Sequence, residues 1–209
     1  MKKCTIVGAG SFAGFCPEFT SEYIIAVDGG YDNLKRFNLS PNLLIGDFDS
    51  IESTPDNIET IRFSSIKDES DLELAVAEAI RRGYVCFYIY GALGGRLDHT
   101  LASIAVLASA SMQGFTGYLV GENERITAIT NKKIAFSKSE SGNISVFPVG
   151  KEAAGVSIGG LKYPLDNAVL SCDSTLGLSN EFIGEDADIE VKDGTLVVVH
   201  TVTRAESVL

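Results

Sequence analysis

The sequence predicts an α/β protein in which a mostly parallel α/β sandwich domain, residues 1–121, is followed by an all-β, sandwich-like domain, residues 122–209. Two observations support this division. Up to about residue 120, short apolar strand patterns alternate with helix patterns, which is typical of a parallel sheet covered by helices. After residue 122 only short strand patterns remain, separated by Gly, Asn and Asp, and this rhythm is typical of a β-sandwich or barrel.

In the first domain, β-branched and aromatic runs predict six strands. They are Thr5–Val7, Tyr23–Val27, Leu43–Ile45, Ile58–Phe63, Val85–Tyr90 and Gly117–Val120. Two helices are signalled between them. Ser70 and Glu73 have the spacing of a capping box, and Arg81-Arg82-Gly83 ends this helix with cations and a glycine stop. Asp98 precedes the second helix, His99–Met112, which is rich in Ala and Leu.

Strand patterns alone continue through the second domain. They cover Arg125–Thr130, Lys133–Ser137, Asn143–Pro148, Gly155–Ile158, Ala168–Leu170, Ala187–Val191 and Leu196–Val202. Asp193-Gly194 lies between the last two, and this dipeptide is a strong signal for a tight β-hairpin turn. We therefore expect these two strands to form a hairpin.

Composition and charge exclude several classes of protein. The 209 residues carry a formal net charge of −11 with no basic tract, so a nucleic-acid partner is not expected. No segment approaches about 18 uninterrupted apolar residues, so a membrane span is not expected either. The four cysteines form no C-x-x-C pair and no zinc-ligand spacing. We expect a cytoplasmic protein with free thiols.

Acidic strings follow several predicted strands of the first domain. They are Asp28-Gly29-Gly30, Gly46-Asp47-Phe48-Asp49-Ser50, Lys67-Asp68-Glu69-Ser70-Asp71 and Gly94-Gly95-Arg96-Leu97-Asp98-His99. The ends of parallel strands converge on one edge of a sheet, where ligands bind. Carboxylates gathered there would repel one another unless a hard cation joined them. Because Mg²⁺ is usually held by one or two carboxylates together with substrate phosphates, the strings predict a metal–nucleotide site.

The second and third strings supply the metal and phosphate chemistry. In an extended segment Asp47 and Asp49 would share a face, with Phe48 pointing to the opposite, core side. Two carboxylates on one face predict a Mg²⁺ site, and an acidic turn at a strand end is the alternative. Lys67 can neutralise phosphate oxygens, and the helix that starts near Asp71 adds backbone N–H groups aimed at an anion.

The fourth string combines a flexible backbone with charge. Gly94 and Gly95 let the backbone approach a ligand closely, and Arg96 can fork onto a phosphate. Asp98 can bind the metal or cap the helix, while His99 is expected to be structural. A helix-capping loop with a solvated arginine is the alternative.

In their order and spacing, these four strings resemble those of thiamin pyrophosphokinases. The resemblance continues in the second domain with Gly160-Leu161-Lys162-Tyr163 and Gly177-Leu178-Ser179-Asn180-Glu181-Phe182, and it covers essentially the whole chain. That family transfers the pyrophosphoryl group of ATP to the hydroxyethyl group of thiamin, giving thiamin diphosphate and AMP. The resemblance implies Mg²⁺, a homodimer with active sites at the interface, a catalytic first domain and a thiamin-binding, dimerising second domain.

The resemblance also implies a role for each matching residue. The metal ligands would be Asp47, Asp49, Asp71 and Asp98. The catalytic residues would be Asp71, Asp98 and Arg96, with the choice of proton acceptor open between the two aspartates. The nucleotide would be held by Asp28, Gly29, Lys67, Asp68, Ser70 and Arg96, and thiamin by Ser179 and Asn180. Tyr163 stands where the family often has Trp; its ring offers a π-face to a cationic thiazolium, or belongs to the core.

Two other functions are compatible with parts of the sequence. Gly8-Ala9-Gly10 follows the first strand like a dinucleotide-binding glycine loop, with its third glycine out of register, and Asp28 lies about twenty residues further on. This favours a nicotinamide-dependent oxidoreductase but leaves the later acidic strings unexplained. A non-catalytic regulator that binds metal and nucleotide is the other alternative, and it would bind ATP without turnover.

Overall fold

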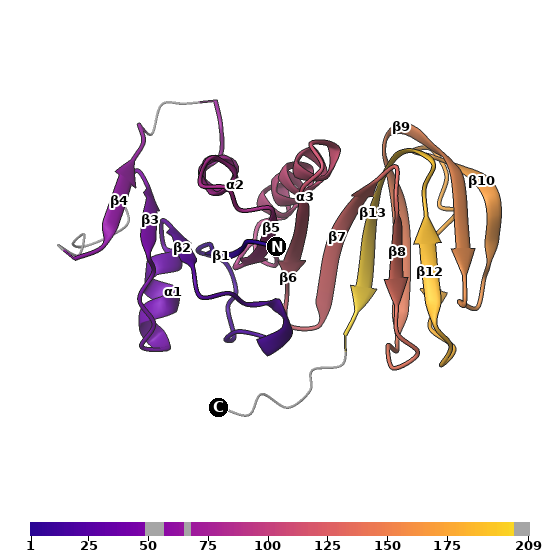
Figure 1. Ribbon diagram of the computed structural model, residues 1–209, viewed down its shortest axis with the longest axis horizontal. Coiled ribbons are helices and arrows are strands. Elements are labelled where there is room, and N and C mark those ends of the chain that lie inside the picture. Colours follow the sequence, from indigo (N-terminus) through magenta and orange to yellow (C-terminus); the bar gives the residue numbers. More distant parts are fainter. Residues whose placement is uncertain (49–56, 65–67, 203–209) are drawn as a thin grey trace. The chain divides into compact units, whose positions relative to one another are not determined.

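The computed structural model describes residues 1–48, 57–64 and 68–202. The chain divides into two compact units (Figure 1). We call Met1–Val106 with Gly117–Gly121 the α/β unit, and Leu107–Thr116 with Glu122–Leu209 the β unit. Among the described residues, no helix is both long and apolar enough to cross a membrane.

The α/β unit is built on a parallel sheet. Its elements are β1 (Lys3–Val7), the short 3₁₀ helix η1 (Pro17–Phe19), β2 (Ile24–Val27), α1 (Gly30–Arg36), β3 (Leu43–Gly46), β4 (Glu59–Arg62), α2 (Asp71–Arg81), β5 (Cys86–Tyr90), the first part of α3 (Leu97–Met112) and nearly all of β6 (Thr116–Val120). The end of α3, from Leu107, and Thr116 of β6 belong to the β unit. The strand order is β4-β3-β2-β1-β5-β6, and β1 to β5 pair in parallel along it. The six predicted strands are confirmed to within two residues at each end.

Helix α2 forms as its sequence predicts. The side chain of Ser70 accepts a hydrogen bond from the backbone N–H of Glu73 (3.2 Å), which is the cap expected from the capping box. Ala75 and Ala79 are fully buried on the face toward the sheet. At the other end, the Arg82 guanidinium donates to Glu78 on the helix (2.6 Å) and to Glu59 on β4 (2.9 Å), which fastens α2 to that strand.

Helix α1 was not predicted, because its seven residues carry no strong local signal. It begins at Gly30 and has no side-chain cap. Isolated helices of this length are unstable in water, so α1 depends on tertiary contacts. Leu34 is fully buried, and the buried Asn33 donates hydrogen bonds to the carbonyl oxygens of Gly8 and Gly10, both at 2.9 Å.

The β unit is dominated by one long strand. Its strands are β7 (Glu124–Thr130), β8 (Lys133–Phe136), β9 (Asn143–Gly159), β10 (Leu165–Ser171), β11 (Asn180–Glu181), β12 (Ala187–Glu190) and β13 (Asp193–Thr201). The order is β7-β13-β9-β12-β8, with β10 and β11 also pairing with β9. Two strands predicted over residues 143–148 and 155–158 are thus parts of the single strand β9. Gly150 and Gly155, at φ of 85° and 64°, let it bend without ending.

The hairpin predicted at Asp193-Gly194 is wrong. β9 lies between β12 and β13 in the strand order, with β12 against its second half and β13 against its first half. The chain therefore continues along β9 instead of turning back. Asp193 still pairs with Ala154, the register shifts before Thr195, and Gly194 has a φ of 107°. The Asp-Gly pair forms a β-bulge at the bend of β9.

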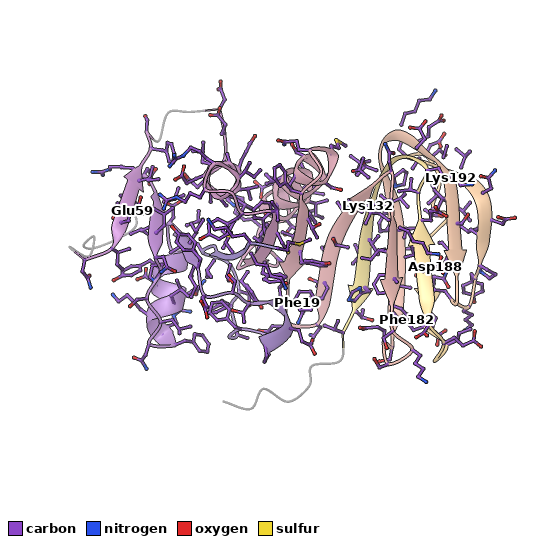
Figure 2. All side chains as sticks on the ribbon, viewed as in Figure 1. Phe19, Glu59, Lys132, Phe182, Asp188 and Lys192 are labelled. Carbon is purple, nitrogen blue, oxygen red and sulfur yellow. The ribbon has the colours of Figure 1, made fainter. Side chains whose placement is uncertain are left out.

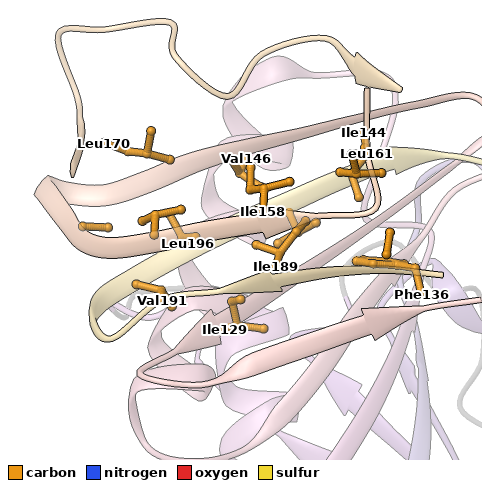
Figure 3. Close-up of a cluster of buried hydrophobic side chains, with 14 of the residues drawn as sticks. Ile129, Phe136, Ile144, Val146, Ile158, Leu161, Leu170, Ile189, Val191 and Leu196 are labelled. Atoms are coloured by element: carbon orange, nitrogen blue, oxygen red, sulfur yellow. The ribbon is translucent and has the colours of Figure 1, made fainter. Parts of the chain in front are cut away.

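The interior of the β unit is an aliphatic core with aromatic side chains at one end (Figure 3). Ile144, Ile189 and Leu196, from three different strands, are almost completely buried in it. Phe136 packs edge-on against Phe182, labelled in Figure 2, with 5.5 Å between ring centroids.

His200 is the buried titratable group of this core. Its ring lies 5.4 Å from that of Phe136, it is 9% exposed, and its Nδ1 has no hydrogen-bond partner among the described residues. Burial, and then the positive charge of Arg125, lowers the pKa of His200 from 6.5 to about 4. Folding therefore favours the neutral imidazole.

We predict a pH-dependent stability that comes from His200. Between pH 6.5 and 4 the unfolded chain binds a proton at this position and the folded chain does not. The free energy of unfolding should fall over that window by up to about 3 kcal/mol, with no contribution above it. Urea unfolding of the wild type and of His200→Leu checks this, because the variant should lack that part of the slope. Equal slopes would contradict the assignment.

Candidate active site

The sheet topology brings the loops of the acidic strings to one edge. The strand order runs outward from β1 through β2, β3 and β4, then returns to β5 on the other side of β1. The carboxyl ends of these parallel strands lie at the same edge, and ligands bind where the order reverses. The loops after β1 and β5 meet at this reversal, and Asp28 and Asp47 follow β2 and β3. Helices α2 and α3 begin at the same edge, because each leads away from the carboxyl end of a parallel strand.

Asp28 lies against the end of the neighbouring strand. It adopts a left-handed conformation (φ 45°), and its backbone N–H donates to the carbonyl oxygen of Ile45 (2.9 Å). Its Oδ1 is so close to Gly46 that a Cβ there would collide with it. Asp47 follows Gly46 directly, so Asp28 packs against the residue that precedes Asp47.

The backbone at Phe48 is not extended, although the predicted shared face of Asp47 and Asp49 requires an extended segment. Phe48 is 8% exposed and packs into the core with Ala26 and Leu44, as predicted, while Asp47 stays half-buried. However, Phe48 has a φ of 62°, so the backbone is not extended at this residue. The extended backbone on which the shared face of Asp47 and Asp49 was predicted ends at Asp47, and Asp49 lies outside the described residues.

The loops after β1 and β5 are packed against each other through glycines. The N–H of Gly8 donates to the carbonyl oxygen of Tyr90, and the N–H of Gly10 to that of Gly91, both at 2.8 Å. A Cβ on Gly10 would lie 2.6 Å from the Gly91 oxygen, and one on Gly91 would overlap the Gly8 oxygen. This close backbone contact accounts for Gly8-Ala9-Gly10 without a dinucleotide. Asn33, which sequence reasoning missed, holds the first loop from α1.

The start of α2 offers an anion-binding end with carboxylates around it. Asp71 is the first residue of the helix and is partly buried, and Asp68 is exposed before it. Ser70 was expected to contact the nucleotide, and its hydroxyl is the helix cap. Lys67 lies outside the described residues. The positive end of the helix dipole at this terminus favours a negatively charged ligand.

Arg96 and Asp98 bind each other in a two-point ion pair. Nη2 donates to Oδ2 at 2.6 Å and Nε donates to Oδ1 at 3.2 Å, and both side chains are largely exposed. The helix starts at Leu97, so Asp98 lies in its first turn, where it also accepts the His99 N–H (3.0 Å). The hydrogen bond from Arg96 lowers the pKa of Asp98 below its ordinary value. The carboxylate is therefore ionised at neutral pH.

Of the metal ligands expected from the sequence, Asp47, Asp71 and Asp98 are described, and they come from the end of β3 and the first turns of α2 and α3, which lie at one edge. Within the described part of the chain, no three His, Cys, Asp or Glu side chains gather closely enough to hold a metal ion.

The candidate thiamin residues belong to the β unit. Ser179 is exposed, with a φ of 57°, and its N–H donates to Ser145 Oγ (3.0 Å). Asn180 is 4% exposed, and its side chain binds the backbone of Tyr163. The ring of Tyr163 is 58% exposed, so it does not belong to the core.

Comparison with known proteins covers both units. Residues 19–119 match the family model of the thiamin pyrophosphokinase catalytic domain, and residues 131–196 that of its vitamin B1 binding domain. A Bacillus subtilis protein named thiamine pyrophosphokinase is 30% identical over 213 residues, which cover 96% of this chain and 99% of that protein. Two crystal structures of thiamin pyrophosphokinases match almost end to end. The structure from Bacillus subtilis has a TM-score of 0.85 at 26% sequence identity, and the match covers 97% of this chain and 100% of that one. The structure from Geobacillus thermodenitrificans has a TM-score of 0.82 at 25% identity, and the match covers 99% of this chain and 100% of that one.

A pair of glycines tests the packing of the two loops. Gly91 and Gly95 both have a left-handed backbone (φ 64° and 80°), but only at Gly91 would a Cβ meet another loop. Gly95→Ala should lower the free energy of unfolding by about 1 kcal/mol through backbone strain alone. Gly91→Ala should lower it by about 3 kcal/mol or more, because the strain is joined by a steric clash. Urea unfolding followed by the far-ultraviolet helical signal measures both, and equal losses would contradict the packing.

Proposed function

This chain belongs to the thiamin pyrophosphokinase family, and we propose that the carboxyl edge of its α/β unit is the phosphate-binding and catalytic site. The protein transfers the pyrophosphoryl group of ATP to thiamin, giving thiamin diphosphate and AMP. The observation that carries the site assignment is that the charged residues following β2, β3 and β5 lie at the carboxyl edge of the parallel sheet, where the strand order reverses. In this proposal, residues 1–121 hold the nucleotide and residues 122–209 hold thiamin.

The residues of this edge fit a magnesium ion. Asp47 is half-buried and directly follows Gly46, against which Asp28 packs, and Asp71 and Asp98 extend the set of oxygen donors. Mg²⁺ needs one or two protein carboxylates when phosphates complete its shell, so a cluster of three is not required. We propose Asp47, Asp49, Asp71 and Asp98 as its ligands. When bound, the ion neutralises charge on the triphosphate.

The chain's own groups position the triphosphate. Arg96 presents a planar, exposed guanidinium that can fork onto phosphate oxygens, and Asp98 keeps it on the loop until the substrate arrives. Helix α2 begins at the same edge with Asp71 at its first position, and its positive dipole end favours phosphate. Phosphoryl transfer depends on such positioning and charge neutralisation more than on covalent help. Asp28, Gly29, Lys67 and Asp68 complete the proposed nucleotide contacts.

Product analysis of aspartate variants tests this site. The wild type should form AMP only when thiamin, ATP and Mg²⁺ are all present, and chelation should abolish the reaction. Asp47→Asn and Asp98→Asn should each lower kcat/KM by about a hundredfold or more, because each removes a preorganised charge. The variants should unfold at wild-type urea concentrations.

A matched control removes one negative charge elsewhere. Asp166, exposed on β10, has no role in the proposed site, so Asp166→Asn should retain wild-type turnover. Near-normal turnover in both edge variants would overturn the assignment of Asp47 and Asp98. Reduction of a nicotinamide would instead support the oxidoreductase alternative, which loses its main signal because Gly8 and Gly10 serve loop packing.

We further propose a cytoplasmic homodimer with composite active sites. The nucleotide and thiamin residues lie in different units, and the β unit exposes apolar side chains that a second copy would cover. They are Phe147, Tyr163, Val169, Leu176, Leu178 and Ile183. All four cysteines are free, which agrees with a reducing compartment.

Mixing inactive variants tests the composite site. Asp98→Asn disables the nucleotide half, and Tyr163→Ala weakens thiamin binding so that this variant turns over little at low thiamin; a mixed dimer would contain one intact site. At low thiamin, an equal mixture after subunit exchange should recover roughly a quarter of wild-type activity, since half the dimers are mixed and each has one site. No recovery, with exchange confirmed by differently tagged chains, would rule out a site shared between subunits.

A further inference from the structure

We infer that Asn180 is a positioning residue for the Tyr163 ring and does not itself bind the substrate. The inference rests on the proposed function, because Tyr163 is taken to face thiamin. It concerns the same site but assigns Asn180 a different role from the one that the sequence motif implied.

The amide of Asn180 is committed to backbone groups. Its Oδ1 accepts hydrogen bonds from the N–H of Tyr163 and from the N–H of Glu181, both at 2.9 Å. Its Nδ2 donates to the carbonyl oxygen of Tyr163 at 2.7 Å. An amide side chain has two acceptor sites and two donor hydrogens, so three of its four bonding positions are filled. With Asn180 only 4% exposed, breaking this set would leave buried polar groups unpaired.

The hydrogen bonds to Tyr163 extend a short pairing between the segments 161–163 and 180–182. Leu161 bridges Phe182, and both side chains lie in the core of the β unit. The N–H of Lys162 donates to the carbonyl oxygen of Glu181 at 3.0 Å. Asn180 extends this pairing by one more residue, since its side chain binds Tyr163 at both N–H and C=O as a neighbouring strand would. The backbone of Tyr163 is thereby held from the buried side.

The Tyr163 ring is exposed although its backbone is fixed. It is 58% exposed, so packing does not explain why its backbone is held so firmly. Pro164 follows it and restricts the backbone of Tyr163 to extended conformations. The ammonium of Lys162 lies 5.7 Å from the ring centroid and is neutralised by Glu181 at 2.6 Å. The ring already attracts a cation, and its anchored backbone lowers the entropy lost when a cationic heterocycle such as thiazolium stacks on it.

A double-mutant cycle on thiamin kinetics tests this role. Asn180→Ala should raise the KM for thiamin roughly tenfold, in line with the loss of buried hydrogen bonds, and leave the KM for ATP within about twofold. In a Tyr163→Ala background the same change should have almost no further effect, because the ring that Asn180 positions is gone. If the two effects add instead, Asn180 contacts thiamin directly and the inference is overturned.

A matched control and a conservative variant complete the design. The Oδ1 of Asn131 likewise accepts a hydrogen bond from a backbone N–H of the β unit, that of Gly194 (2.8 Å). Asn131→Ala therefore removes a similar hydrogen bond elsewhere and should leave the thiamin KM unchanged. Asn180→Asp keeps the acceptor oxygen and loses the donor to Tyr163. If Asn180 positions the ring, the thiamin KM should rise. A new negative charge in direct contact with cationic thiamin would lower it, and an unchanged or lower KM overturns the inference.

The activity of the wild-type protein distinguishes a failure of the proposed function from a failure of the role assigned to Asn180. If the wild-type protein forms no AMP from ATP and thiamin, the proposed function itself fails. An active wild type with a folded Asn180→Ala variant of unchanged thiamin KM leaves that function intact and overturns only the role of Asn180.

Discussion

The site depends on the parallel pairing of β1 with both β2 and β5. Parallel strands present all their carboxyl ends at one edge, so loops that are far apart in the chain begin as neighbours. β1 is central because the strand order reverses around it, and the loop that follows β1 touches the loop that follows β5 through Gly8, Gly10 and Gly91. If this contact were looser, the charged groups that follow β2, β3 and β5 would lose their common frame.

Local signals were sufficient wherever the structure depends on local chemistry. The strands of the α/β unit follow from β-branched and aromatic runs, and α2 follows from the Ser70 cap. Helix α1 was not predicted because it is stabilised by tertiary contacts, namely the buried Leu34 and the hydrogen bonds of Asn33 to another loop. No pattern within its seven residues indicates such contacts. The Asp193-Gly194 signal misled for the same reason. Its partner is the bend of β9, about forty residues earlier in the chain.

The candidate site shows a similar limit. The four acidic strings predict the edge and its chemistry, because residue type and strand position both appear in the sequence. They did not show how each side chain is occupied. Ser70 caps a helix, Asn180 binds backbone, and Arg96 pairs with Asp98. The left-handed backbone at Phe48 ends the extended geometry that was assumed for Asp47 and Asp49, and no local sequence signal indicates it.

The contact between Asp28 and Gly46 means that substitutions at these two positions are not independent of each other. The carboxylate oxygen occupies the space that any side chain at position 46 would need. A larger residue at position 46 could be accepted only after position 28 had changed to a smaller side chain. If Gly46 were replaced first, the new side chain would collide with Asp28 and disrupt the end of β3. The two positions should therefore vary together among descendants of this sequence, although eighteen positions separate them.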